Sequence, residues 1–372
     1  MVLKRVIIKL GTSTLTAGGQ SISLPHLLDF IKEAAWLHQA GFEVVLISSG
    51  AVAAGKDALK QPTLDKHIPA KQMLAAIGQS HLMEIYNQLF QMYGITVAQV
   101  LLTRDDLLSR NRYLNARNTL EALIEYRVIP IINENDTVAT EEIRFGDNDN
   151  LSAQVANLVE ADLLVLMTDQ DGLYTSDPRT NPEARLIELI DTPEIPEELF
   201  QGAGSSNSGL GTGGMQTKLK AAELARHSGA MVYIVSGQDP AILRQIVYGE
   251  TVGTRFLPVI STLENRKRFL LAHATSSSGL IKVDSGAATA LRKGGSLLPV
   301  GIRETSGTFD RGDIVRVDTV KGKPVVVGIA NYNSNEIQLI AGQRSSQIEN
   351  ILGYTYGDEV IHHNNMVVLN HE

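Results

Sequence analysis

The first two thirds of the chain alternate short apolar runs with longer segments in which apolar residues recur every three or four positions. The short runs are apolar on both faces and predict buried strands; they cover residues 6–10, 42–47, 96–102, 128–132, 163–167 and 231–235. The longer segments predict helices over residues 25–41, 70–93, 115–126, 151–160 and 218–227. Such alternation favours a sheet covered by helices on both sides. We therefore predict an α/β fold, a three-layer αβα sandwich with a mostly parallel open sheet.

The pattern weakens between residues 254 and 278, where we place a domain boundary. Beyond it, glycines separate short apolar runs, which predict strands over residues 280–283, 314–317, 325–330 and 336–340. The predicted domains are residues 1–260, which hold the large sheet, and residues 277–358, which form a small β-rich domain.

Four polar or glycine-rich loops follow apolar runs, at residues 133–136, 146–150, 168–172 and 209–218. In parallel α/β sheets, ligands bind beyond the carboxyl ends of the strands, so these loops are candidates for one site. Acidic side chains can hold a divalent metal or a substrate ammonium, and glycine backbone with a lysine suits phosphate oxygens. Together the loops suggest phosphoryl transfer from a nucleotide.

Composition narrows the function classes. The chain has no cysteine, which excludes disulfides, thiolate zinc sites and cysteine nucleophiles. Its first nine residues contain too short an apolar run for a signal peptide, and no stretch reaches the roughly 18 apolar residues of a membrane span. A net charge of −8 argues against general affinity for nucleic acid. We expect a soluble, cytoplasmic protein without membrane association.

Two familiar motifs are rejected on their context. Residues 50–56 match the first seven positions of a P-loop, but Asp57 stands where Ser or Thr would hold magnesium. A carboxylate there would repel phosphate, so we predict a helix whose small residues allow close packing. Residues 209–214 fit the dinucleotide pattern GxGxxG but do not follow a strand, which argues against hydride transfer. Those glycines still suit a flexible phosphate loop.

Six stretches, taken in order, resemble the amino acid kinase family. They are residues 8–13, 48–51, 132–136, 146–152, 168–169 and 211–218. Their sequences most resemble the branch of the family that phosphorylates the side chain of L-glutamate in proline biosynthesis. Residues 294–301 and 309–313 resemble a PUA domain. The resemblance implies binding of ATP, Mg²⁺ and L-glutamate, formation of γ-glutamyl phosphate, feedback inhibition by proline and a homo-oligomer, either dimer or tetramer. It also implies a downstream glutamyl-phosphate reductase as a partner.

The implied acceptor is a carboxylate that is already ionised at neutral pH, so no general base is needed. Catalysis would then come from alignment and from cancelling charge on the phosphoryl group. The resemblance assigns Lys9 and Lys218 as hydrogen-bond donors to the phosphate oxygens from opposite sides. It assigns Asp149 to orient the two lysines and to keep them apart. From the residues alone, Lys9 could instead be a snorkelling lysine on a half-exposed strand, and Lys218 an ordinary lysine in the first turn of a helix.

The resemblance also implies the binding residues. Mixed Asp and Asn chemistry suits the ammonium and carboxylate of an amino acid. The substrate set is Ser49, Gly50, Asn133, Asp136, Asp147 and Asn148, with the first two offering backbone N–H groups. The nucleotide set is Lys9, Thr168, Asp169, Gly211, Thr212, Gly213, Gly214, Met215, Gln216, Thr217 and Lys218.

For some of these residues a purely structural role is an alternative. Asp149 or Asn150 could simply cap a helix beginning near Leu151, and Ser49 could be a plain N-cap. Whether Asp169 contacts base, ribose or metal is also open, as are the protein ligands of the metal.

Two other functions compete. The same fold could phosphorylate acetylglutamate, aspartate or carbamate. Alternatively, the C-terminal domain could bind structured RNA as the principal activity. However, residues 277–358 contain nine Lys or Arg and eight Asp or Glu, a net of +1, with no basic run. RNA binding usually leaves a larger basic footprint, so we expect no RNA partner.

Overall fold

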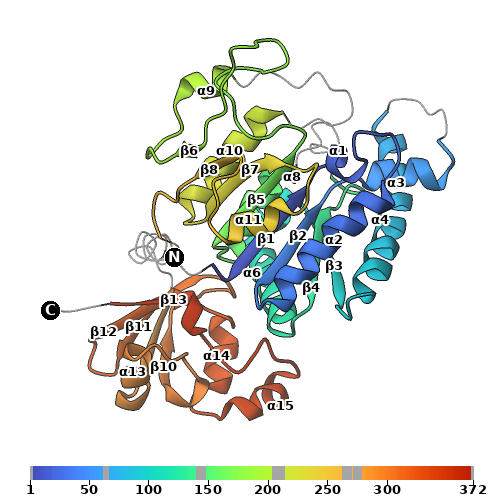
Figure 1. Ribbon diagram of the computed structural model, residues 1–372. Coiled ribbons are helices and arrows are strands. Elements are labelled where there is room, and N and C mark those ends of the chain that lie inside the picture. The colour runs from blue at the N-terminus through green and yellow to red at the C-terminus, as the bar shows by residue number, and fades with distance from the viewer. Residues whose placement is uncertain are drawn as a thin grey trace. The chain divides into compact units, whose positions relative to one another are not determined.

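The computed structural model describes residues 3–61, 67–139, 148–202, 214–261, 270 and 279–369. The chain divides into two compact units. The first comprises Met1–Ser109 and Asn115–Thr262, and the second comprises Arg110–Leu114 and Leu263–Glu372. Each has its own sheet (Figure 1). No helix among the described residues is long and apolar enough to cross a membrane.

An eight-stranded sheet forms the centre of the first unit, in the order β3-β4-β2-β1-β5-β7-β8-β6. Every neighbouring pair is parallel except β7 and β8, which confirms the predicted mostly parallel open sheet. The strands are β1 (Arg5–Leu10), β2 (Glu43–Ser48), β3 (Val97–Leu102), β4 (Ile129–Glu134), β5 (Leu163–Thr168), β6 (Leu189–Ile190), β7 (Met231–Ser236) and β8 (Thr254–Phe256).

Helices cover both faces of this sheet, as predicted (Figure 1). On one face, Val6, Ile8 and Leu10 of β1 pack in one core cluster with residues of α2, α4 and α11. Side chains alternate between the faces of a strand, so Ile7 and Lys9 face the other way, where α8 packs on β1 and α10 packs on α8. The helices of this unit are α1 (Thr12–Leu15), α2 (Leu24–Gln39), α3 (Ala51–Ala58), α4 (Ile68–Gln91), α5 (Arg104–Leu108), α6 (Arg110–Glu125), α8 (Asn148–Leu158), α9 (Glu197–Gly202), α10 (Met215–His227) and α11 (Ile242–Val247). Of α6, the residues Arg110–Leu114 belong to the second unit.

Helices α3 and α4 pack with their backbones in contact through two glycines. A Cβ on Gly78 would lie 1.8 Å from the carbonyl oxygen of Ala51, and a Cβ on Gly55 would lie 2.0 Å from that of Leu74. The P-loop-like segment is therefore a close-packing helix, as predicted. Asp57 accepts hydrogen bonds from the Ser21 hydroxyl (2.6 Å) and the Ile22 N–H (2.9 Å), which ties the end of α3 to the loop before α2.

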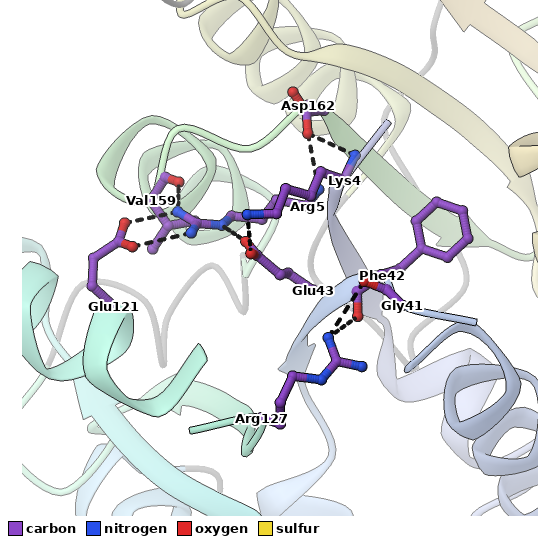
Figure 2. Close-up of polar contacts among 9 residues, drawn as sticks. All are labelled: Lys4, Arg5, Gly41, Phe42, Glu43, Glu121, Arg127, Val159 and Asp162. Atoms are coloured by element: carbon purple, nitrogen blue, oxygen red, sulfur yellow. Dashed lines mark hydrogen bonds and ion pairs between the residues drawn. The ribbon is translucent and has the colours of Figure 1, made fainter. Parts of the chain in front are cut away.

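A charged clasp fixes the amino end of β1, away from the loops that follow the strands (Figure 2). The guanidinium of Arg5 donates to Glu43 on β2 (2.8 Å) and to both oxygens of Glu121 on α6 (2.7 and 3.0 Å). It also contacts the carbonyl oxygen of Val159. The backbone N–H groups of Lys4 and Arg5 both donate to Asp162 at 2.9 Å. The clasp joins four segments and thereby sets the position of β1 along its own axis.

The second unit holds a five-stranded sheet in the order β10-β9-β11-β12-β13, antiparallel except between β9 and β11. Its own core includes Ile281, Leu291, Val317, Val326 and Ile337. The elements are β9 (Gly279–Val283), α13 (Ser285–Arg292), η1 (Pro299–Gly301), β10 (Ile302–Ser306), β11 (Ile314–Thr319), β12 (Pro324–Ile329), α14 (Ser334–Ile340), η2 (Ser345–Gln347), α15 (Ile348–Leu352), η3 (His363–Asn365) and β13 (Met366–Val368).

The predicted strand over residues 336–340 is wrong, because this segment is helix α14. A capping box starts the helix: the Asn333 side chain accepts from the Glu336 N–H (2.9 Å), and the Glu336 carboxylate accepts from the Asn333 N–H (2.8 Å). The apolar residues of the segment are also spaced for a helix, since Ile337 and Ile340 are buried while Leu339 is exposed.

Candidate active site

Two lysines and one aspartate from three distant segments meet at the carboxyl end of the sheet. The Nζ atom of Lys9, on β1, lies 2.6 Å from Oδ1 of Asp149, and Nζ of Lys218, on α10, lies 3.1 Å from Oδ2. Asp149 is completely buried, and the lysines are 5% and 6% exposed. The hydroxyl of Thr217 donates to the same Oδ2 at 2.8 Å. The carboxylate therefore holds both ammonium groups in fixed positions.

Burial acts against ionisation of Asp149 and by itself would raise the pKa of this carboxyl. The positive charges of Lys9 and Lys218 outweigh burial and hold the pKa well below its ordinary value. The aspartate is accordingly ionised at neutral pH. With both lysines protonated, the group of three carries one surplus positive charge in a site of low exposure, which suits an anionic ligand.

Lys218 does lie in the first turn of α10, as its alternative interpretation expected, but the alternatives for Lys9 and Asp149 do not describe the structure. Lys9 is buried, so it is not a snorkelling side chain on a half-exposed strand. Helix α8 begins at Asn148, before Asp149 and Asn150, so neither of these is the cap of a helix starting near Leu151. The helix begins earlier than predicted. The prediction missed its first turn because that turn is polar and carries no apolar periodicity.

A second cluster lies beside the first and consists of neutral polar groups. The Nδ2 atom of Asn148 donates to Oδ1 of Asn133 (2.9 Å), to the carbonyl oxygen of Ser48 (2.9 Å) and to Oγ of Ser49 (3.1 Å). Asn133 is the penultimate residue of β4 and Ser48 is the last residue of β2, and these strands are neighbours. Three of the predicted substrate residues, Ser49, Asn133 and Asn148, are thus joined directly.

Gly50 precedes helix α3 with a left-handed backbone, at φ +91°. This conformation favours glycine, and a Cβ there would lie 2.9 Å from Cδ1 of Leu15. Gly50, and not Ser49, is the N-cap residue of α3, and no side chain caps this helix. The plain N-cap interpretation of Ser49 is therefore wrong, and the first N–H groups of α3 follow directly after the polar cluster.

The structure describes some, but not all, of the remaining predicted site residues. Thr168 ends β5, is buried, and donates its hydroxyl to Oδ1 of Asp169 at 3.0 Å. Asp136 lies on the turn after β4 and is half-buried. Gly214 is the N-cap residue of α10 and Met215 is its first residue, but Gln216 donates to the carbonyl oxygen of Phe200 on α9 (3.1 Å). Outside the described residues lie Asp147, Gly211, Thr212 and Gly213.

Sequence reasoning missed two residues that support the site. Gln79 on α4 accepts from Nδ2 of Asn133 at 2.8 Å. Tyr86, also on α4, lies 2.9 Å from the Ser48 hydroxyl, and burial raises the pKa of its phenol, although this hydrogen bond acts in the opposite direction. Neither residue belongs to a motif, and both approach the loops only through folding. The one sequence signal was the helical periodicity of α4, which says nothing of polar contacts.

No group of three or more acidic, His or Cys side chains suited to a metal ion occurs among the described residues. Both oxygens of Asp149 already contact lysines. Mg²⁺ commonly binds through substrate phosphates, waters and one or two carboxylates, without a cage made of protein alone. The residues present are therefore compatible with an ion that is carried on a nucleotide and takes few ligands from the protein.

The sheet and the buried group of two lysines and an aspartate are features expected of a phosphotransferase. Residues 4–236 match the amino acid kinase family, and residues 279–352 match the PUA domain. Glutamate 5-kinase of Shewanella amazonensis is 50% identical over 98% of this chain and 96% of that protein. Those of Pasteurella multocida and Haemophilus influenzae are each 47% identical over 98% of this chain and 99% of theirs.

The chain therefore belongs to the glutamate 5-kinases of the amino acid kinase family, with a C-terminal PUA domain. A solved UMP kinase from Bacillus anthracis is similar over 70% of this chain and 98% of that one, at 17% identity and a TM-score of 0.47.

Proposed function

We propose that this protein transfers the γ-phosphoryl group of ATP to the side-chain carboxylate of L-glutamate. The product is L-glutamyl 5-phosphate, and the reaction is the first step of proline biosynthesis. The observation that carries the proposal is the single buried carboxylate of Asp149 held between Lys9 and Lys218, next to the amide cluster around Asn148. The glutamate 5-kinase relatives, matched over nearly their whole length, supply the acceptor.

In the chemical step, an oxygen of the glutamate side-chain carboxylate attacks the γ-phosphorus. The bond from that phosphorus to the bridging oxygen breaks, and ADP leaves with the bond's electrons. No proton needs to be removed from the acceptor, because the carboxylate is ionised at neutral pH. The charge that develops on the phosphoryl oxygens and on the leaving oxygen is the main quantity to be stabilised.

Lys9 and Lys218 would supply this stabilisation by donating to the phosphate oxygens from two sides. Asp149 acts as a positioning residue: each of its oxygens fixes one ammonium group. Without nucleotide, its charge also offsets the repulsion between the lysines. Because the three groups together keep one positive charge, phosphate binding gains charge neutralisation without displacing Asp149.

The acceptor would lie over the ends of β2 and β4. Asp136, Asp147 and Asn148 would hold its α-amino and α-carboxylate groups, with help from Asn133. The predicted use of the Ser49 backbone N–H is wrong, because this group donates to the carbonyl oxygen of Leu10 (3.0 Å). The N–H groups that follow it, at the start of α3, would bind the side-chain carboxylate of the acceptor or the phosphoryl group. In this arrangement the nucleophilic oxygen would face the γ-phosphoryl group held by the two lysines.

The nucleotide would lie on the side of β5 and α10. Thr168 and Asp169 would contact it, and residues 211–217 would cover its phosphates ahead of Lys218. Mg²⁺, when bound to ATP, supplies further neutralisation of the β- and γ-phosphate charge. We further propose a cytoplasmic homo-oligomer, dimer or tetramer, that is inhibited by proline at or overlapping the glutamate site and hands its labile product to a glutamyl-phosphate reductase.

Trapping the acyl phosphate with hydroxylamine tests this function. Purified protein is incubated with ATP, Mg²⁺ and hydroxylamine, and with L-glutamate, N-acetylglutamate or L-aspartate in parallel, and hydroxamate is measured. We expect hydroxamate with glutamate, and none when ATP is omitted. Preference for acetylglutamate or aspartate would replace the proposed acceptor, and no product with any acid would reject the kinase reaction.

A further inference from the structure

The side-chain amide of Asn133 is fixed at both of its ends. Its Oδ1 accepts from the backbone N–H of Glu134 (2.9 Å) and from Nδ2 of Asn148 (2.9 Å). A backbone N–H can only donate, so the orientation of this amide is determined, and its Nδ2 must be a donor. That Nδ2 donates to Oε1 of Gln79 at 2.8 Å. Since Asn133 is 2% exposed, water cannot easily replace this acceptor.

The orientation of Asn133 in turn sets that of Asn148. The amino end of the Asn148 amide is committed to acceptors on Asn133, Ser48 and Ser49. Its carbonyl end is therefore the end that can accept from a substrate ammonium. If Asn133 rotated by half a turn about its amide, two amino groups would face each other and Asn148 would lose its alignment.

Gln79 also occupies a position that is fixed relative to the start of α3. Its neighbour Gly78 approaches Ala51 so closely that an added Cβ would lie 1.8 Å from the carbonyl oxygen. Ala51 directly follows Gly50, the N-cap residue of α3. Gln79 thus connects the two parts of the acceptor site, the start of α3 and the amide at the end of β4.

We propose that Gln79 is a positioning residue that sets the affinity of the site for its amino acid acceptor. It acts through Asn133 and Asn148 and contacts neither the phosphate-binding lysines nor the nucleotide side of the sheet. This inference rests on the proposed function, since it concerns the acceptor side of the same reaction.

The test compares Gln79→Leu, which removes the acceptor oxygen at similar size, with Gln79→Glu, which keeps one. Gln79→Leu should raise the KM for glutamate about tenfold, the effect of one lost buried hydrogen bond, while kcat and the KM for ATP stay within about twofold. Gln79→Glu should restore most of the affinity. The matched control is Gln88→Leu on the same helix, whose exposed side chain donates a hydrogen bond to Glu84 (3.3 Å), and it should leave all three constants unchanged.

Should Gln79→Leu fail to fold, Gln79→Asn provides the second variant, because it withdraws the acceptor by one methylene and should raise the KM for glutamate likewise. The inference is overturned if the leucine or asparagine variant keeps the wild-type KM for glutamate, if the KM for ATP rises equally, or if Gln79→Glu is as impaired as Gln79→Leu. Absence of glutamate-dependent ADP release by the wild-type protein would overturn the proposed function itself, and this inference with it.

Discussion

Lys9 and Lys218 contact different oxygens of one buried carboxylate, although β1 and α10 lie near opposite ends of the first unit's sequence. Asp149 between them carries one negative charge against two positive ones. Removing either lysine leaves a neutral pair, whereas removing the aspartate leaves two like charges in a buried site. Because of this difference, we expect replacement of Asp149 to affect folding and replacement of either lysine to affect mainly catalysis.

Replacing Asp149 with Asn should destabilise the protein in the absence of ligands. The change leaves two buried ammonium groups without their counter-charge, and breaking a buried ion pair in this way typically costs about 3–5 kcal/mol. Thermal unfolding checks this. We also expect ATP to raise the Tm of the variant more than that of the wild type, because phosphate supplies the missing negative charge. Equal Tm values without ligand would contradict the prediction.

The stability conferred by Asp149 should depend on pH in a defined window. Its folded-state pKa lies below the value in the unfolded chain, so its contribution is fully present above the unfolded pKa of about 3.9. It is lost as the pH falls from there through the lower folded-state pKa. The difference in unfolding free energy between wild type and Asp149→Asn, measured in urea, should therefore stay constant from pH 7 to about pH 5 and shrink below about pH 4. Loss of the difference already between pH 7 and 5 would contradict this.

Asp136→Ala should weaken apparent glutamate affinity and affect turnover less. Asp136 is proposed to pair with the substrate ammonium, so its removal should raise the KM for glutamate about tenfold or more. Steady-state kinetics with varied glutamate measure this, with the KM for ATP as the internal control. A change in thermal stability alone, with normal kinetic constants, would make Asp136 a structural residue.

Gly78→Ala should destabilise the first unit by forcing α3 and α4 apart. The added Cβ would meet backbone atoms, at 1.8 Å from the Ala51 oxygen and 2.3 Å from the Gly55 nitrogen, and neither can rotate away. We expect a loss of about 1–3 kcal/mol by urea unfolding. Gly286→Ala, on the exposed face of α13 with its nearest contact at 3.4 Å, is the control and should be neutral or slightly stabilising. Equal effects at the two sites would contradict the prediction.

The strands of the large sheet were predictable because strands that are buried on both faces are apolar at consecutive positions. The direction of the Lys9 side chain was not predictable. Its neighbours Ile8 and Leu10 are both apolar, so they do not indicate to which face of the sheet Lys9 points. Only the pairing of β1 with its neighbours and the packing of α8 decide it. At residues 336–340 the apolar pattern predicted a strand, and a local capping box produced a helix instead.

The site was predictable where loops follow strands, because the topology collects the carboxyl ends of parallel strands. Gln79 and Tyr86 lay beyond that argument. They reach the site from the middle of a long helix, through side-chain contacts with Asn133 and Ser48 that depend on how α4 packs. Sequence periodicity places such residues on a helix but does not identify their partners.

The turnover of Lys9→Ala and Lys218→Ala in the hydroxylamine assay tests the central claim most directly. We expect each variant to fold with nearly wild-type Tm, to keep its KM for glutamate, and to lose about 100-fold or more in kcat, as for removal of a transition-state donor. Wild-type turnover in either variant, or a loss that merely follows unfolding, would contradict a phosphoryl group held between these two lysines.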